Sequence, residues 1–215
     1  MSRRRAWRAA WVGRPFRREA VWTAGLFLAA GLAQTRFLAW NESRQGVVLA
    51  DPILACFAPR DVSLAIFAVV WLGIALAVGR LAREPARLLR TVQGYAYLLL
   101  LRVALMWLMP LDPPPTIIPL RDPITEPLST GRPLTHDLFF SGHTSVLFLL
   151  FLALPRGRCR GVLLVASVAV ALLTVWQHNH YVVDVLTAPF FAYGCMHLAR
   201  VGRAPLRPLP QEAAD

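Results

Sequence analysis

Six stretches of mostly apolar residues run along the chain, and shorter polar segments separate them. A helix that crosses the hydrocarbon core of a bilayer needs about 20 mostly apolar residues, or somewhat fewer where polar ends reach the interface. We therefore predict an all-α membrane protein with six transmembrane helices. Their predicted positions are residues 21–40, 62–79, 92–109, 138–154, 161–176 and 181–198.

The first of these stretches is the weakest, because Gln34 and Arg36 interrupt it. A secretory signal peptide is the competing interpretation, since arginines precede an apolar run that ends in small residues. The small-x-small cleavage pattern is poor and apolar residues resume at Phe37, which favours a retained helix. We expect an Arg-rich segment over 1–20, a six-helix catalytic domain over 21–199 and a tail over 200–215, with both end segments cytoplasmic.

Composition supports a membrane protein. Of the 215 residues, 56% are hydrophobic and 16% charged, whereas an average soluble domain carries about 25% charged residues. The net charge of +11 is also typical of nucleic-acid-binding proteins. Here, however, the arginines form short clusters between long apolar runs, so we expect a bilayer partner and no nucleic acid. The three scattered cysteines predict neither disulfides nor a zinc site, and we expect all three to be buried.

The arginines also predict the topology. If six helices alternate in direction, 17 of the 23 arginines fall on the side of the two termini, and only four on the other side. That other side also carries seven carboxylates: Glu42, Asp51, Asp61, Asp112, Asp122, Glu126 and Asp137. Positive loops mark the cytoplasmic side. Both termini are therefore expected in the cytoplasm of a multi-pass protein, with the cell membrane as its expected location.

Two arginines fall inside predicted helices, where a central position costs about 2.5–3.5 kcal/mol. We expect Arg36 to reach the outer interface. Arg102 lies eight residues before Pro110, about 12 Å deep at 1.5 Å per residue, and is expected to have a specific partner. The proline-rich 111–137 segment faces the same outer side, either as a lid over a site or as an ordinary loop.

Three ionisable groups are predicted at the outer level of the helices. His143 lies near the start of the fourth helix, and His180 and Asp184 open the sixth. The spacing of four places His180 and Asp184 on one helix face, where the carboxylate can orient the ring. His180 could then attack phosphorus, while His143 acts as acid and base, and neither step needs a metal or cofactor. A metal site, a serine nucleophile at Ser141 or buried structural histidines are the weaker alternatives.

Near helix starts, polar groups can contact phosphate oxygens. We expect the substrate-binding residues to be Ser141, Gly142, Thr144, Arg102, Asp137, Tyr181 and His178. His178 could equally be a supporting hydrogen bonder or an interfacial residue. Tyr181 also fits an aromatic belt.

Ser-Gly-His-Thr at 141–144, followed by His-Tyr-x-x-Asp at 180–184, resembles the sphingomyelin synthase branch of the type 2 phosphatidic acid phosphatase superfamily. Asp137 precedes Ser141 at that family's spacing. Arg102 with the Pro110–Pro113 stretch resembles its third helix, and the segment from Asp51 to Asp61 resembles its loop before the second helix. The likeness runs from about residue 47 to 198. The Ser-Arg pair of the ordinary lipid phosphatases is replaced by Leu173 and Thr174, which favours the transferase branch.

This resemblance implies six membrane helices and an active site on the exoplasmic or periplasmic face. His180 would be the nucleophile, Asp184 its orienting partner and His143 the acid and base. The implied reaction moves a phosphoalcohol headgroup from a glycerophospholipid donor to a lipid hydroxyl, ceramide-like or diacylglycerol-like. Two alternatives stay open: a lipid phosphatase or phospholipase C-like hydrolase that uses water, and a non-catalytic lipid binder or transporter.

Overall fold

The computed structural model describes residues 2–121 and 134–201, and within these ranges it is all-helical with no strand. The α-helices are α1 (Arg3–Val12), α2 (Arg14–Asn41), α3 (Ser63–Leu81), α4 (Pro85–Leu108), α5 (Gly142–Ala153), α6 (Arg158–Trp176) and α7 (Val182–Val201); a short 3₁₀ turn covers Leu54–Cys56. The predicted all-α class is confirmed.

Four of the helices, α3, α4, α6 and α7, are long and apolar enough to cross a membrane. They support a helical membrane protein. α5 is apolar but has only 12 residues. At 1.5 Å per residue it is about 18 Å long, short of the roughly 30 Å hydrocarbon core.

Each predicted stretch contains a helix, but three predicted starts were wrong: α2 and α4 each begin seven residues earlier than predicted, at Arg14 and Pro85, and α5 begins later. The first long helix begins at Arg14, where Pro15 occupies the first turn and its fixed φ favours helix initiation. The fourth begins at Gly142 rather than at residue 138. Phe139 and Phe140 have positive φ angles of 56° and 48°, which an α-helix does not accommodate.

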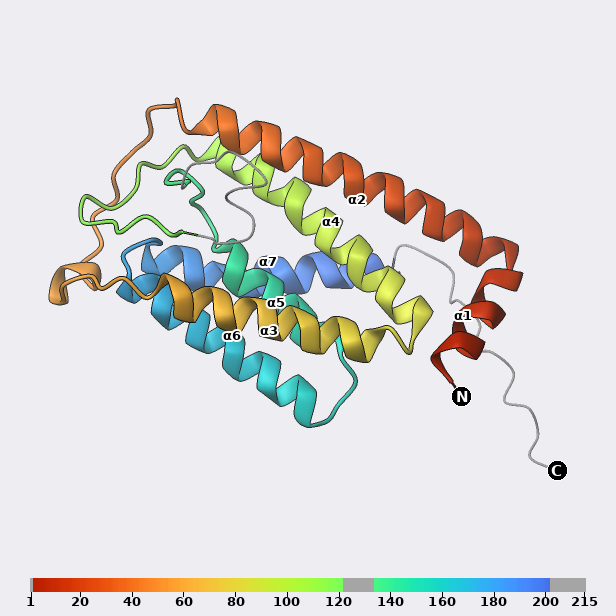
Figure 1. Ribbon diagram of the computed structural model, residues 1–215. Helices are drawn as coiled ribbons and strands as arrows, with labels where there is room; N and C mark the ends of the chain where they lie inside the picture. The colour runs from red at the N-terminus through yellow and green to blue at the C-terminus, as the bar shows by residue number, and fades with distance from the viewer. Residues whose placement is uncertain (1, 122–133, 202–215) are drawn as a thin grey trace.

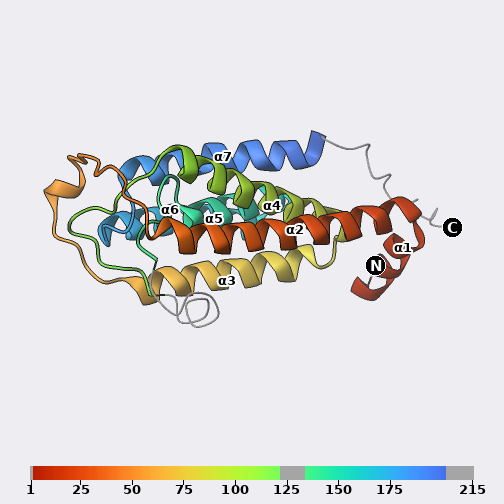
Figure 2. The same ribbon diagram turned by 90° about the horizontal axis from the view of Figure 1, so that it is seen from above.

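The six helices from α2 to α7 alternate in direction, so the bundle has two distinct ends (Figure 1). We call one the loop end; it holds the segments 42–62, 109–121, 134–141 and 177–181. The opposite end, which we call the basic end, holds α1, the short links 82–84 and 154–157, and the last turn of α7. Figure 2 shows the same division from above, with α1 at one extremity and the long loops at the other.

α5 lies inside the bundle and contacts α3, α4, α6 and α7. Its Leu147 is fully buried, and a Cβ added at Gly73 of α3 would lie only 2.6 Å from that side chain, so glycine permits the close approach. α2 packs along α4, where the Gln93 amide donates a 2.7 Å hydrogen bond to the Thr23 hydroxyl. Burial inside the bundle fixes α5 although it is too short to cross alone.

α1 was not predicted as a helix. Ser2 caps it by accepting a hydrogen bond from the Arg5 amide, and Trp7 Nε1 donates to the Ala82 carbonyl at 2.8 Å. This docking to the α3–α4 link supplies stability that the local sequence does not signal. The expectation for the cysteines was also partly wrong: Cys195 is buried, but Cys56 is exposed and Cys159 half-buried, because Cys56 lies in the surface turn of the 42–62 loop.

Candidate active site

A non-helical segment enters the loop end of the bundle and leads into α5. Leu138, Phe140 and Ser141 in this segment are buried, so its backbone polar groups need partners inside the protein. The Ser141 hydroxyl accepts from the Thr144 amide at 3.4 Å, and the Ser141 amide donates to the Asp184 carbonyl at 3.0 Å. Ser141 thus caps α5 and ties its first turn to the start of α7.

Arg102, on α4, supports the same segment from the other side. Its side chain is buried, and its guanidinium donates to the Phe140 carbonyl and to the Asp137 carboxylate. A Cβ added at Gly142 would lie 3.0 Å from Arg102 Cζ, so the guanidinium lies against this glycine. The expectation that Arg102 has a specific partner is therefore confirmed. The partner is Asp137, and the Phe140 carbonyl of the non-helical segment is a second acceptor.

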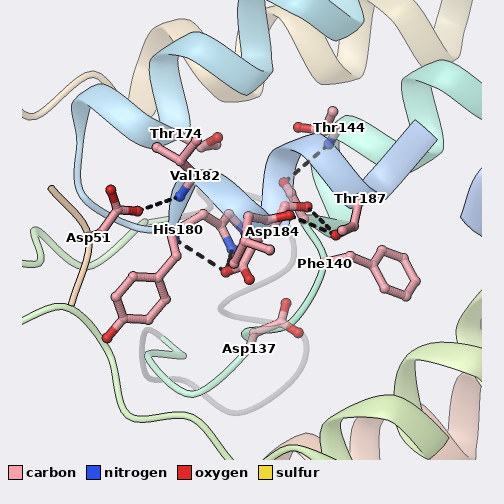
Figure 3. Close-up of polar contacts among 12 residues, drawn as sticks. Asp51, Asp137, Phe140, Thr144, Thr174, His180, Val182, Asp184 and Thr187 are labelled. Carbon is pink, nitrogen blue, oxygen red and sulfur yellow. Dashed lines mark hydrogen bonds and ion pairs between the residues drawn. The ribbon is translucent and has the colours of Figure 1, made fainter. Parts of the chain in front are cut away.

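His180 and Asp184 form a buried pair at the start of α7. The ring atom His180 Nδ1 lies 3.1 Å from Asp184 Oδ2, and both side chains are almost completely buried (2% and 0% exposed). The same carboxylate oxygen accepts from the Tyr181 amide at 3.3 Å. Because Nδ1 faces the carboxylate, Nε2 is the nitrogen available for chemistry (Figure 3).

His143 is the second residue of α5, and α5 begins beside Asp184. Its ring packs edge-to-face on Phe67 of α3, with 5.4 Å between the ring centroids. The N-terminal turns of α5 and α7 thus bring the three predicted catalytic residues to one region of the loop end. The spacing of four between His180 and Asp184 produces the predicted contact.

Asp51 is a supporting residue that the sequence analysis did not assign to the site. Its Oδ2 accepts from the Val182 amide at 2.8 Å and so caps α7 (Figure 3). Its Oδ1 accepts from the Ile53 amide within its own loop. A carboxylate at a helix N-terminus also interacts favourably with the helix dipole. The sequence did mark the segment that begins at Asp51, because it is part of the resemblance described above. It could not show the contact itself, because Val182 lies far from Asp51 in the sequence.

Tyr181 and Gln177 hold the surrounding loops together. The Tyr181 hydroxyl donates to the Asp112 carbonyl at 2.9 Å and accepts from the Leu49 amide at 3.2 Å. Gln177 is fully buried and donates to the Ser63 hydroxyl at 2.8 Å. Tyr181 is therefore a buried cross-link and not a belt residue exposed at the interface. Its assigned contact with substrate stays a prediction.

His178 is 2% exposed and its Nδ1 lies 2.6 Å from the Thr116 hydroxyl. Of the two interpretations left open, the structure favours a supporting hydrogen bonder over an interfacial residue. His178 lies in the turn between α6 and α7 and has a positive φ of 55°. Burial lowers the pKa of His178 below the ordinary histidine value, since the charged ring would lose hydration.

A second polar cluster lies at the loop end and was missed. His136 Nδ1 is 3.3 Å from Glu42, at the end of α2, and its Nε2 is 3.3 Å from Asp112. The Glu42 carboxylate also accepts from the amides of Thr135 and His136 at 2.9 and 2.8 Å. This cluster anchors the 134–141 segment at the end of α2. Residues 122–133, the central part of the 111–137 segment that was predicted as either a lid or an ordinary loop, lie outside the described residues.

Within the described parts of the chain, no group of three or more His, Cys, Asp or Glu side chains is arranged to hold a metal ion. The described groups of the site are an oriented imidazole, a second imidazole on a neighbouring helix and a helix N-terminus. No family model matches this chain, and neither does any curated protein sequence.

Proposed function

We propose that this chain is a membrane-embedded phosphotransferase that moves a phosphoalcohol headgroup from a glycerophospholipid to a lipid hydroxyl. The observation that carries the proposal is the junction of α5 with α7. There the Ser141–Asp184 hydrogen bond lies between the buried His180–Asp184 pair and the turn that bears His143. Two imidazoles and one orienting carboxylate are the groups that a two-step transfer through phosphohistidine requires.

In the first step, His180 Nε2 attacks the donor phosphorus and the bond to the diacylglycerol oxygen breaks. His143 gives its proton to that oxygen, so the leaving group departs as a neutral alcohol. Asp184 accepts from Nδ1–H of His180 and stabilises the positive ring as the N–P bond forms. The headgroup phosphate is then bound covalently to His180.

In the second step, the now neutral His143 removes the proton from an acceptor hydroxyl. The resulting oxygen attacks phosphorus, the N–P bond breaks, and His180 is regenerated. The resemblance to the synthase branch favours a ceramide-like or diacylglycerol-like acceptor.

We place six membrane passes in the chain, with both termini in the cytoplasm and the site on the exoplasmic or periplasmic side. The alternating directions of α2 to α7 support this arrangement (Figure 1). The positions of most arginines in the sequence, on the elements at the basic end, support it too. The 134–141 segment would complete the pass of the short α5. Non-helical backbone at such depth is tolerated where protein satisfies it, as Arg102 and Asp184 do here.

Phosphate contacts are assigned to the first turn of α5, with Gly142 and Thr144 near the helix N-terminus. Arg102 would act mainly by holding this turn in place, because Asp137 and the Phe140 carbonyl already engage its guanidinium. Asp137 retains partial exposure at 27% of its side chain, so it lies at the edge of the site. The site would need no metal and no organic cofactor.

The test is reconstitution of the full chain in vesicles that contain choline, ethanolamine and glycerol phospholipids with labelled headgroups, plus ceramide and diacylglycerol. Products are identified by mass spectrometry. We expect labelled headgroup on a lipid acceptor, and its loss in His180→Ala. His197→Ala is the matched control, because His197 is exposed near the basic end and stacks on Tyr193.

Two other outcomes of this experiment would point to different functions. Free phosphoalcohol or phosphate, lost in His180→Ala, would mean that water is the acceptor and the protein is a hydrolase. Lipid profiles that are identical for wild type and His180→Ala would contradict catalysis and favour a lipid binder or transporter.

A further inference from the structure

The basic end of the bundle presents an arginine surface that the proposed reaction does not use. Its members come from α1 and the first turns of α2, and we call it the arginine platform: Arg3, Arg4, Arg5, Arg8, Arg14, Arg17 and Arg18. All seven side chains are exposed. Glu19 is the only carboxylate among the first 20 residues of the sequence, so the platform has a large excess of positive charge.

The platform is held in place and is not a loose tail. Trp7 of α1 is fixed by its 2.8 Å hydrogen bond to the Ala82 carbonyl, in the link between α3 and α4. Trp7 and Trp11 both pack edge-to-face on the buried Phe16 of α2, at centroid distances of 6.4 and 5.8 Å. Binding to such a surface costs little ordering entropy, because the arginine-bearing backbone is already positioned.

Large apolar side chains lie exposed beside these arginines. Trp11 is 45% exposed and Val12 81%, and Val21 and Trp22 follow on the next turns of α2 at 70% and 57%. Tryptophan next to arginine is the composition of a surface at the level of lipid headgroups, where the ring contacts acyl chains and the cation contacts phosphate. This juxtaposition favours a lipid surface over nucleic acid, which would leave the apolar groups in water.

The charges of the platform are unfavourable for the two helices themselves. α1 starts with three consecutive arginines and α2 starts with Arg14, yet neither helix has an acidic residue in its first turn. Cations near a helix N-terminus oppose the helix dipole, and the pair Arg4 and Arg8, four residues apart, repel each other. An anion bound over these turns would offset both effects.

We propose that the arginine platform binds the headgroups of anionic phospholipids in the leaflet next to the basic end. Trp11 and Trp22 insert at the acyl boundary while the arginines contact phosphates. This inference requires that the protein lies in a bilayer but does not depend on the proposed reaction. Each arginine near an anionic surface contributes about 1 kcal/mol, or about fivefold in affinity.

Brominated lipids, which quench nearby tryptophans, test the proposal with the full chain in phosphatidylcholine nanodiscs. One reporter retains Trp7, Trp11 and Trp22 and carries W40F/W71F/W107F/W176F. The other reporter retains Trp40, Trp107 and Trp176 at the loop end. We expect brominated phosphatidylglycerol to quench the first reporter at about a tenfold lower mole fraction than brominated phosphatidylcholine, and the second reporter equally with both lipids.

Two variants of the first reporter complete the experiment. R3Q/R4Q/R5Q/R8Q/R14Q/R17Q/R18Q should abolish the preference, whereas the same seven positions changed to lysine should retain most of it because the charge is kept. Equal quenching by the two lipids in the unsubstituted reporter, or a preference that survives the glutamine substitutions, would overturn the proposal. Binding of a labelled oligonucleotide at physiological salt, without any lipid preference, would assign the platform to nucleic acid instead.

Discussion

The two ends of the bundle carry polar groups in opposite ways. At the loop end, charged and polar side chains are buried and matched to partners inside the protein, as Arg102 is to Asp137 and His180 to Asp184. At the basic end, the arginines of α1 are exposed. Polar groups that a protein satisfies internally are held in a defined geometry, which chemistry requires. Exposed charges of one sign instead create an electrostatic field outside the chain.

Removal of the Asp184 carboxylate, which orients His180, should give the largest difference in transfer rate between substitutions at the two ends. We expect Asp184→Asn to lower the rate of headgroup transfer about 10²- to 10⁴-fold, because the amide no longer holds the His180 ring in the required tautomer. Glu84→Gln, which removes the surface ion pairs with Arg80 and Arg87 at the basic end, should change the rate little. Equal loss in both variants would contradict the division of roles.

Loss of a buried arginine should cost far more stability than loss of an exposed one. Arg102→Met leaves the Phe140 carbonyl and the Asp137 carboxylate without their donor, and should lower the free energy of unfolding by about 3–5 kcal/mol. Arg83→Met, in the exposed link at the basic end, should change it by less than about 0.5 kcal/mol. Unfolding of both variants in detergent would measure the difference, and similar values would show that Arg102 is not a structural anchor.

Disturbing the packing of Gly142 against Arg102 should have an intermediate effect on stability. Gly142→Ala places a methyl group 3.0 Å from Arg102 Cζ and should cost about 1–3 kcal/mol, with a lower transfer rate because the first turn of α5 shifts. Gly79→Ala, in α3 near the basic end, meets nothing within 4 Å and should be neutral or slightly stabilising. Thermal unfolding in nanodiscs compares the two, and a neutral Gly142→Ala would contradict the close contact.

The smallest effect should come from pH. Because burial lowers the pKa of His178, the folded chain holds this ring neutral while the unfolded chain protonates it near pH 6.5. The resulting stability is present above pH 6.5 and is lost as the pH falls through the folded-state pKa. His178→Gln should therefore flatten the acid side of the stability profile, whereas His197→Gln near the basic end should leave it unchanged. An unaltered profile in His178→Gln would contradict the lowered pKa.

Much of the fold follows from hydrophobic pattern alone. Each of the six predicted stretches contains a helix, because an apolar run of this length has no alternative that satisfies its backbone in a membrane. The start of α5 could not be predicted in this way. Phe139 and Phe140 are apolar and continue the pattern, but their backbone is left-handed, and the partners of this segment, Arg102 at the Phe140 carbonyl and Asp184 at the Ser141 amide, come from helices distant in sequence.

The site shows the same limit. Local spacing predicted the His180–Asp184 contact, since residues four apart share a helix face. The depth of Arg102 predicted that it has a partner, and the contact is with Asp137. The capping of α7 by Asp51 and the cross-links through Tyr181 and Gln177 join residues separated by 69 or more positions. No periodicity in one sequence reports such pairings.

The most direct test of the central claim is to trap the covalent intermediate. Full-length protein is mixed with phospholipid carrying a labelled headgroup, quenched under alkaline conditions that preserve phosphohistidine, and digested for mass spectrometry. We expect a phosphoalcohol adduct on His180, which accumulates in the absence of a lipid acceptor and disappears when ceramide or diacylglycerol is added. Active enzyme that never carries the adduct on His180, or carries it on another residue, would contradict the account.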